Sequence, residues 1–238
     1  MSREGPDTVK HMRAALRAQG FAVHPIKNRP PYLRSYGFTP DVVIDVGVGS
    51  GTPWLYRSFK GARFVLIDPQ SHCAAEVREK GHLQDFHFHA VALGAEQGQA
   101  VLTVPFSEKK KEAAMASLKR RTDKLAERFV RTEEEEVPVK TLDEIALAYG
   151  GSVGLKLDAE GSELEVLQGA KSTLQRCEFV LLEMSVMPRF EGVGLPSELM
   201  ALLSDAGLQM RDVLSFGSGP GKKAHPRYLD VLFTSWAI

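Results

Sequence analysis

The chain of 238 residues is long enough to bury a sizeable core and falls within the range of one ordinary domain. Its 30 basic and 30 acidic side chains cancel, so no overall field attracts nucleic acid or an anionic membrane. The charged N-terminal segment is unlike a signal peptide, and no run approaches the ~20 apolar residues of a membrane-spanning helix. Cys73 and Cys177 are far apart in the sequence and are expected to be reduced thiols. Composition therefore predicts a cytoplasmic protein with no membrane span and no nucleic-acid partner.

Short apolar runs alternate with segments of helical periodicity from residue 41 onwards. The expected strands are 42–46, 63–68, 86–91, 153–158, 179–183, 208–214 and 228–236. The expected helices are 7–19, 52–60, 71–81, 141–149, 161–176 and 196–206. Such alternation indicates a doubly wound, Rossmann-like α/β fold with a mostly parallel seven-stranded sheet. The last two strands are joined by a Gly/Pro-rich loop without a helix, which predicts that the last strand is antiparallel.

One domain over residues 41–238 accounts for this pattern, preceded by a helical and loop extension over residues 1–40. Residues 107–136 interrupt the domain with many charges, yet four apolar residues recur there at helical spacing. These four residues are Met115, Leu118, Leu125 and Phe129. They predict a charged helical insertion at the rim of the domain. The sequence leaves open whether this insertion is a solvated surface helix or a mobile lid over an acceptor site.

A glycine-rich loop follows the first expected strand. Gly47, Gly49 and Gly51 come after an acid, Asp45, in the pattern D-x-G-x-G-x-G. Glycine permits a tight turn and a close approach of backbone to a ligand, and the next helix would present free N–H groups there. The dinucleotide fingerprint G-x-G-x-x-G is not met in either register. A carboxylate at this place suits a sulfonium better than a pyrophosphate, which favours S-adenosylmethionine as the ligand.

Carboxylates also lie at the ends of later strands. Asp68 ends the second strand, where it can accept hydrogen bonds from the ribose hydroxyls of an adenosyl group, as similar acids do in NAD enzymes. Asp158 ends the strand 153–158 and Glu160 follows it, and either could orient the methyl donor or accept a proton. Lys156 within that strand needs a partner, and a neighbouring carboxylate is the obvious one. Ligands of doubly wound sheets bind at the carboxyl ends of the strands, so these side chains should converge.

The helix after Glu160 has a clear start signal. Ser162 and Glu165 fit a capping box, in which Ser162 accepts from a free N–H and Glu165 reaches back. Glu163 and Glu165 are then ordinary acids of a first helical turn.

In order and spacing, these motifs resemble the FkbM family of methyltransferases, over about residues 41–185. The motifs are DVGVGSG at 45–51, LIDP at 66–69, HAVALG at 89–94, VPVKTLD at 137–143 and LKLDAEGSELEVLQGA at 155–170. The resemblance implies a Rossmann-like class I methyltransferase fold and S-adenosylmethionine as methyl donor. It also implies O-methylation of a sugar, glycan or natural-product hydroxyl. The family often has Ala-Asn where this chain has Val48-Gly49, and Glu where it has Asp68.

The resemblance places a donor site on the glycine loop and the following strand ends. We assign to it Asp45, Gly47, Val48, Gly49, Ser50, Gly51, Asp68, Pro69, Ala92 and Asp158. Asp158 and Glu160 would face the methyl group as catalytic residues, with His225 as an alternative base near neutral pH.

Two loops are expected to shape the acceptor side. Arg189, Lys222 and Lys223 could bind a phosphate or carboxylate of the acceptor, although they could equally be solvated loop charges. No metal is assigned, because the histidines show no metal-ligand spacing. Whether a divalent metal assists at Asp158 is left open.

Two alternatives accompany the O-methyltransferase hypothesis. The first is an NAD-dependent oxidoreductase on the same fold, against which the missing fingerprint argues. The second is a non-catalytic S-adenosylmethionine-binding protein, which would have little use for Asp158 and Glu160. The expected partner is a small-molecule or glycan acceptor. The sequence defines neither its identity nor the oligomeric state, for which a homodimer is one option.

Overall fold

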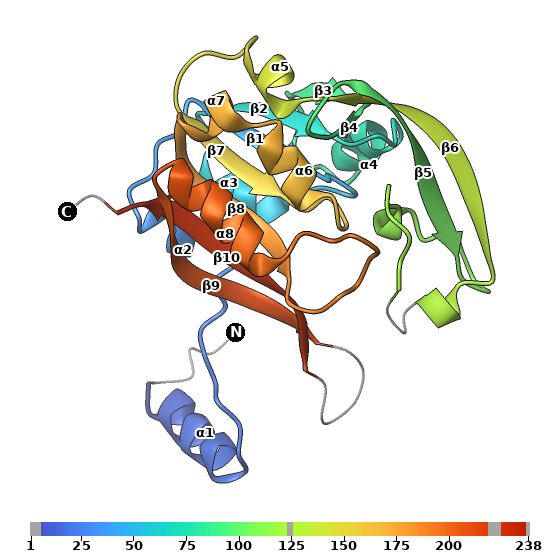
Figure 1. The fold of residues 1–238 in the computed structure, drawn as a ribbon. Helices are drawn as coiled ribbons and strands as arrows, with labels where there is room; N and C mark the ends of the chain where they lie inside the picture. The colour runs from blue at the N-terminus through green and yellow to red at the C-terminus, as the bar shows by residue number, and fades with distance from the viewer. Residues whose placement is uncertain (1–5, 123–125, 219–224, 237–238) are drawn as a thin grey trace.

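A seven-stranded sheet forms the centre of the computed structural model, which describes residues 6–122, 126–218 and 225–236 (Figure 1). Its strand order is β3-β2-β1-β7-β8-β10-β9. The strands are β1 (Val42–Val46), β2 (Arg63–Ile67), β3 (His87–His89), β7 (Val153–Leu157), β8 (Cys177–Ser185), β9 (Leu208–Ser218) and β10 (Pro226–Ser235). All neighbouring pairs are parallel except those that β10 forms with β8 and β9. The predicted Rossmann-like α/β fold with an antiparallel last strand is confirmed.

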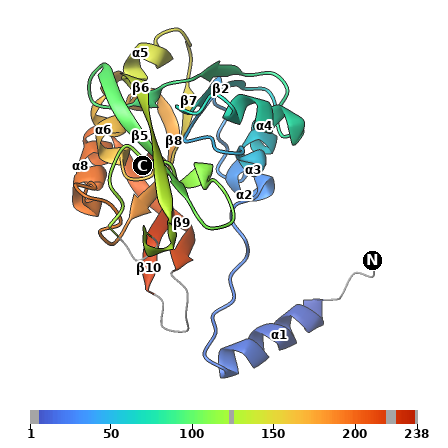
Figure 2. The same cartoon turned by 90° about the vertical axis from the view of Figure 1, so that its right-hand side faces the viewer.

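Helices cover both faces of this sheet (Figure 2). One face carries α2 (Pro30–Arg34), α3 (Pro53–Ser58) and α4 (Cys73–Glu79). The other carries α5 (Leu142–Ala146), α6 (Glu163–Gln168), α7 (Lys171–Leu174) and α8 (Pro196–Asp205). Successive strand residues alternate between two cores, so that Val43 packs with the first group of helices and Ile44 with the second. Burial on both faces explains why the strands read as continuous apolar runs.

The helix expected over residues 161–176 is two helices, α6 and α7. The first ends at Gln168, and a Cβ added to the next residue, Gly169, would lie 2.2 Å from the carbonyl oxygen of Gly94. This close packing against the loop after β4 (Ala92–Leu93) bends the chain between the two helices.

A second sheet stands where a helical insertion was expected. It has the order β4-β6-β5, in which β5 (Gly98–Phe106) and β6 (Arg131–Lys140) form an antiparallel ribbon. Within the described residues between them, the chain forms two 3₁₀ turns, η1 (Ala113–Met115) and η2 (Ala126–Arg128). The prediction of a helix over 107–136 is therefore wrong. Met115 lies in η1, and Leu118 packs against the small core of this sheet rather than on a helical stripe. Leu125 lies outside the described residues.

The N-terminal extension contains α1 (Pro6–Ala18), which projects away from the sheets in both views (Figures 1 and 2). The chain that follows is fastened to β9. Lys27 Nζ lies 2.6 Å from Asp212 Oδ1, and Asn28 Nδ2 donates to Ser215 Oγ at 3.3 Å. These contacts bring the extension to the carboxyl end of the central sheet. In the described part of the chain, no helix is both long and apolar enough to cross a membrane.

Candidate active site

A cavity of about 440 Å³ lies at the carboxyl ends of the parallel strands. Apart from Asp45, every residue predicted to bind the donor lines it. These residues are Gly47, Val48, Gly49, Ser50, Gly51, Asp68, Pro69, Ala92 and Asp158. The catalytic candidate Glu160 lines the same cavity. The structure thus gathers residues from four separate sequence motifs around one space.

The glycine loop owes its shape to one very close backbone contact. Gly47 has a φ of +70°, and a Cβ there would lie 1.6 Å from the carbonyl oxygen of Asp158. Any larger residue would have to push the end of β7 away from the end of β1. Gly49 also has a positive φ, of +49°, but the space around it is open. Gly47 is therefore required for packing, whereas Gly49 leaves room above the loop.

The assignment of Asp45 to the donor site needs correction, because Asp45 lies within β1 beneath the loop and is fully buried. Its Oδ2 accepts a hydrogen bond from Tyr56 Oη at 2.6 Å, and its Oδ1 lies 3.2 Å from Lys156 Nζ. Lys156 Nζ also donates to the carbonyl of Gly47 at 2.7 Å. Burial opposes the charge of Lys156, but Asp45 and Asp158 raise its pKa. Asp45 therefore holds the loop in place through Lys156, whose predicted carboxylate partner is confirmed.

Asp68 stands at the end of β2 with a carboxylate fixed from two sides. Its Oδ2 accepts from the Gly49 N–H at 3.0 Å and its Oδ1 from the Gln70 N–H at 2.9 Å. The side chain is buried but lines the cavity. Each carboxylate oxygen has a further lone pair, so Asp68 can also accept hydrogen bonds from a ligand hydroxyl.

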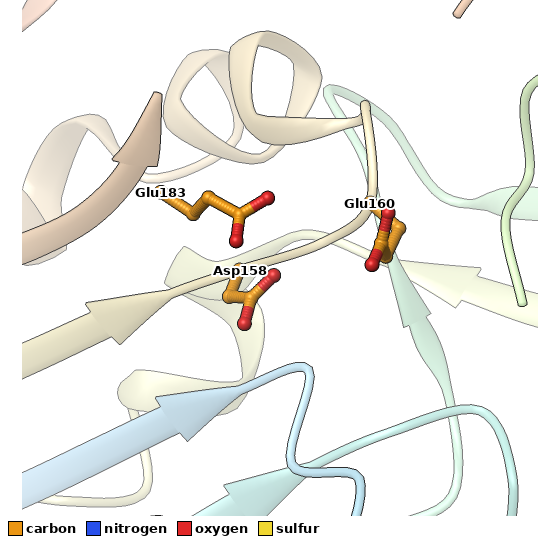
Figure 3. A group of neighbouring side chains, drawn as sticks. All are labelled: Asp158, Glu160 and Glu183. Carbon is orange, nitrogen blue, oxygen red and sulfur yellow. The ribbon is translucent and has the colours of Figure 1, made fainter. Parts of the chain in front are cut away.

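Three carboxylates turn towards a common space at the other end of the cavity (Figure 3). One oxygen each of Asp158, Glu160 and Glu183 lies within 4.8 Å of the others. Asp158 follows β7, Glu160 lies in the turn before α6 with a φ of +45°, and Glu183 belongs to β8. Sequence reasoning missed Glu183. The available signal was a lone acid near the carboxyl end of an otherwise apolar parallel strand.

Two arginines bind this cluster of carboxylates. Arg189 Nη2 lies 3.0 Å from Glu160 Oε2, and its Nη1 forms an ion pair with Glu183. Arg121 Nη2 lies 2.7 Å from Glu160 Oε2. Arg189 is only 4% exposed. Its guanidinium faces inward onto two carboxylates, so the structure does not show the predicted contact surface for an anionic acceptor.

Burial and mutual repulsion change the proton affinity of the cluster. Burial, and then the charge of Asp158, raise the pKa of Glu183 to about 8 against the opposing effect of Arg189. Burial and Asp158 also raise the pKa of Glu160, although Arg189 and Arg121 both lower it. Glu183 is thus a carboxyl that exchanges a proton near neutral pH.

Glu163 has a structural part in the site that the sequence did not indicate. Its side chain is buried, and its Oε1 accepts from the Ala159 N–H at 2.9 Å and the Gly161 N–H at 3.1 Å. Burial raises the pKa of Glu163 to about 7. The predicted capping box is wrong, because the Ser162 side chain makes no capping hydrogen bond. Glu163 instead closes the turn between β7 and α6 from within.

Part of the chain between β5 and β6 crosses one side of the cavity. We call residues 112–122 the strap. Gln70 Nε2 donates to the Ala113 carbonyl at 2.9 Å, and Ser117 Oγ donates to the Glu160 carbonyl at 2.7 Å. The strap residues that line the cavity are Ala113, Ala114, Ala116, Ser117 and Leu118. The strap therefore borders the cavity, and its movement as a lid stays a prediction.

The remaining predicted residues lie elsewhere. His225 is exposed and is not among the residues that line the cavity. Its proposed role as a base therefore has no support in the described contacts. Lys222 and Lys223 lie outside the described residues.

Residues 45–210 match the Methyltransferase FkbM domain. The chain belongs to the FkbM methyltransferase family. The matched region of this FkbM methyltransferase includes the glycine loop, Asp68 and the whole cluster of carboxylates. Membership in a methyltransferase family argues against the oxidoreductase alternative.

Solved structures of other methyltransferases are also similar. An O-methyltransferase from Bacillus cereus in complex with SAH matches with a TM-score of 0.47 at 13% identity, over 96% of this chain and 90% of that one. The magnesium protoporphyrin IX methyltransferase of Synechocystis with bound SAM matches with a TM-score of 0.45 at 11% identity, over 99% and 87%. A search of curated proteins gave no match.

Proposed function

We propose that this chain transfers the methyl group of S-adenosylmethionine to a hydroxyl oxygen of a sugar, glycan or natural-product acceptor. One observation carries the proposal. A single cavity joins the glycine loop and Asp68 to a cluster of carboxylates. The first end offers a carboxylate fixed by backbone N–H groups, suited to the hydroxyls of an adenosyl group. The second end offers negative charge, suited to a sulfonium.

The charges around the cavity support a cationic donor. Carboxylates at its far end outnumber the cations that they contact. The carboxylates lining the cavity there are Asp158, Glu160, Glu183 and Asp230. The cations are Arg121, Arg189 and Lys156, and Lys156 also serves the buried Asp45. The excess of negative charge attracts a positively charged ligand and repels a phosphate.

S-adenosylmethionine supplies a methyl carbon bonded to a positively charged sulfur. The chain then has to align the acceptor, exclude water and receive a proton. Asp158 is the most open carboxylate of the cluster, with a side chain 34% exposed against 20% for Glu160 and 12% for Glu183. We assign Asp158 to orient the acceptor hydroxyl. Glu160, bound by two guanidiniums, fixes the turn beside it, and the strap limits the access of water.

Calorimetric titration tests the identity of the methyl donor. We expect saturable binding of S-adenosylmethionine and of S-adenosylhomocysteine, and none of NAD. Asp68→Ala should weaken both interactions roughly 100-fold, because charge-assisted hydrogen bonds to the ligand are lost. Asp85→Ala is the matched control, since Asp85 is exposed. Binding of NAD alone would overturn the proposal.

Methyl transfer tests the acceptor class. The full chain would be incubated with methyl-labelled S-adenosylmethionine and a panel of sugars, glycans and hydroxylated natural products. Label recovered as a methyl ether supports the proposal, whereas label on nitrogen or carbon contradicts O-methylation. Donor binding without transfer to any acceptor would favour the non-catalytic binding protein.

A further inference from the structure

Methylation of a hydroxyl releases a proton, and the contacts within the cluster distinguish the carboxylates that could receive it. Glu160 contacts two guanidiniums, at 2.7 Å and 3.0 Å, which stabilise its ionised form against the opposing effect of burial. Asp158 lies 3.4 Å from Lys156 Nζ and is the most open of the three. Glu183 is the least exposed of the three, and its ion pair is with Arg189, which also binds Glu160. Burial therefore favours the protonated form most strongly at Glu183.

Charged and titratable groups face Glu183 from each neighbouring element. Its own strand leads to the loop that carries Arg189, and the turn between β7 and α6 contributes Asp158 and Glu160. On the other side, β10 places Asp230 opposite Glu183 in register, with Tyr228 two residues away. These neighbours present the carboxyl groups of Asp158, Glu160 and Asp230, while the cations of the cluster are divided: Arg189 is shared with Glu160, Arg121 contacts Glu160 and Lys156 contacts Asp158. Burial and the repulsion by these carboxyl groups therefore favour the neutral, protonated form of Glu183 before any ligand binds.

A sulfonium bound in this cavity reverses that balance. One added positive charge near the cluster stabilises a carboxylate relative to a carboxylic acid. When methyl transfer is complete, the sulfur is neutral and the field returns to its former state. The charge lost from sulfur equals the charge of the proton gained from the acceptor, so the cluster and the sulfur together have the same net charge before and after the reaction.

We propose that Glu183 is the residue that takes the acceptor's proton, and that the positive charge of the bound donor first converts it to the carboxylate. This inference rests on the proposed function. In the step, the acceptor oxygen forms a bond to the methyl carbon and the carbon–sulfur bond breaks, with its electron pair staying on sulfur. The hydroxyl proton passes to a Glu183 carboxylate oxygen and leaves to solvent in exchange for the next donor.

The proposal predicts a proton linkage that needs no acceptor. Titration calorimetry of the full chain near neutral pH, in phosphate and in Tris, separates the heat of binding from that of buffer protonation. We expect S-adenosylmethionine to release close to one proton on binding, and S-adenosylhomocysteine almost none. The affinity for S-adenosylmethionine should rise by up to about tenfold per pH unit below the pKa of the free residue.

Variants identify the group that loses this proton. Glu183→Gln should abolish the release and make donor affinity independent of pH. Glu178→Gln, on the same strand but at its opposite end, should leave both unchanged. Asp158→Asn should move the release to lower pH without abolishing it, because a repelling charge has been removed. This third variant keeps the test decisive if Glu183→Gln does not fold.

The two proposals fail in different ways. If S-adenosylmethionine binds without releasing a proton, or if Glu183→Gln releases it as the wild type does, Glu183 does not have this role and the proposed function stands. If S-adenosylmethionine does not bind to the wild-type chain, both proposals are overturned.

Discussion

Gly47 is the residue at which the glycine loop tolerates the least change. In Gly47→Ala the added Cβ would lie 1.6 Å from the carbonyl oxygen of Asp158. The alanine would also have to keep a φ of +70°, which is unfavourable for a residue with a Cβ. We expect a loss of roughly 3 kcal/mol or more in the free energy of unfolding, together with loss of donor binding. Denaturant unfolding and calorimetry measure the two effects.

Other glycines of the chain provide the controls for that substitution. At Gly49 the φ is +49° but nothing lies within 4 Å, so Gly49→Ala should cost only about 1–2 kcal/mol of backbone strain. Gly61 has neither a positive φ nor a close neighbour, and Gly61→Ala should be nearly neutral. Equal stability of the Gly47 and Gly61 variants would show that the ends of β1 and β7 separate easily.

How far single residues could be predicted depended on where they stand in a strand. Asp68 and Asp158 end predicted strands, and strand ends converge in any doubly wound sheet. Glu183 ends the predicted strand 179–183, so the same rule indicates it, although β8 continues to Ser185. Asp45 lies inside a strand, where the direction of the side chain decides its role. Asp45 points into the core and Glu183 into the cavity. That difference depends on packing across the sheet, which a local pattern does not contain.

At the scale of elements, the strands and helices of the central sheet were predictable because each is buried by its neighbours in a regular alternation. The secondary structure of β5, β6 and the segment between them was not predictable in this way. Its partners are distant in sequence, as in the pairing of Leu102 with Glu135, and one face of the ribbon is exposed. The acidic run Glu133–Glu136 is exposed on β6. Apolar residues at helical spacing, such as Met115 and Leu118, were coincidental there.

The strap depends on a few buried polar contacts, and Ser117 makes two of them. Its Oγ donates to the Glu160 carbonyl at 2.7 Å and accepts from the Lys119 N–H at 2.9 Å. Ser117→Ala leaves both backbone groups without these partners, at about 1–3 kcal/mol of local stability. We expect amide hydrogen exchange in the strap to rise about 10- to 100-fold while global stability changes little.

Two further exchange measurements test whether Ser117 holds the strap in place, one on a control variant and one with the donor bound. Ser172→Ala, at an exposed position of α7, should leave exchange in the strap unchanged. Binding of S-adenosylmethionine should slow exchange there in the wild type, because strap residues line the cavity. Unaltered exchange in Ser117→Ala would show that the strap is held by the ion pairs of Lys119 and Arg121 instead.

At the scale of the whole molecule, the buried carboxyls of the site make folding sensitive to pH. Glu163 and Glu183 have pKa values of about 7 and about 8, both raised mainly by burial from an ordinary 4.5. Between the ordinary pKa of 4.5 and these raised values, the folded chain therefore binds more protons than the unfolded chain. A raised folded pKa gives stability that is complete below the unfolded value and is lost as pH rises through the folded one. The pKa of His89 is lowered by burial, which has the opposite effect below its ordinary value of 6.5.

We therefore expect the free energy of unfolding of the ligand-free chain to fall from about pH 4.5 to about pH 8. Glu163→Gln should remove roughly 3 kcal/mol of that fall, its part between about pH 4.5 and about pH 7, because glutamine cannot ionise but can still accept from the Ala159 and Gly161 N–H groups. Glu79→Gln, at an exposed position of α4, should keep the wild-type profile. Urea unfolding at a series of pH values measures the free energy of unfolding of the wild type and of both variants. A wild-type stability that instead stays level over this range would mean that Glu163 and Glu183 are already ionised in the folded chain, and the site would then need a counter-charge beyond Arg189 and Arg121 to hold them.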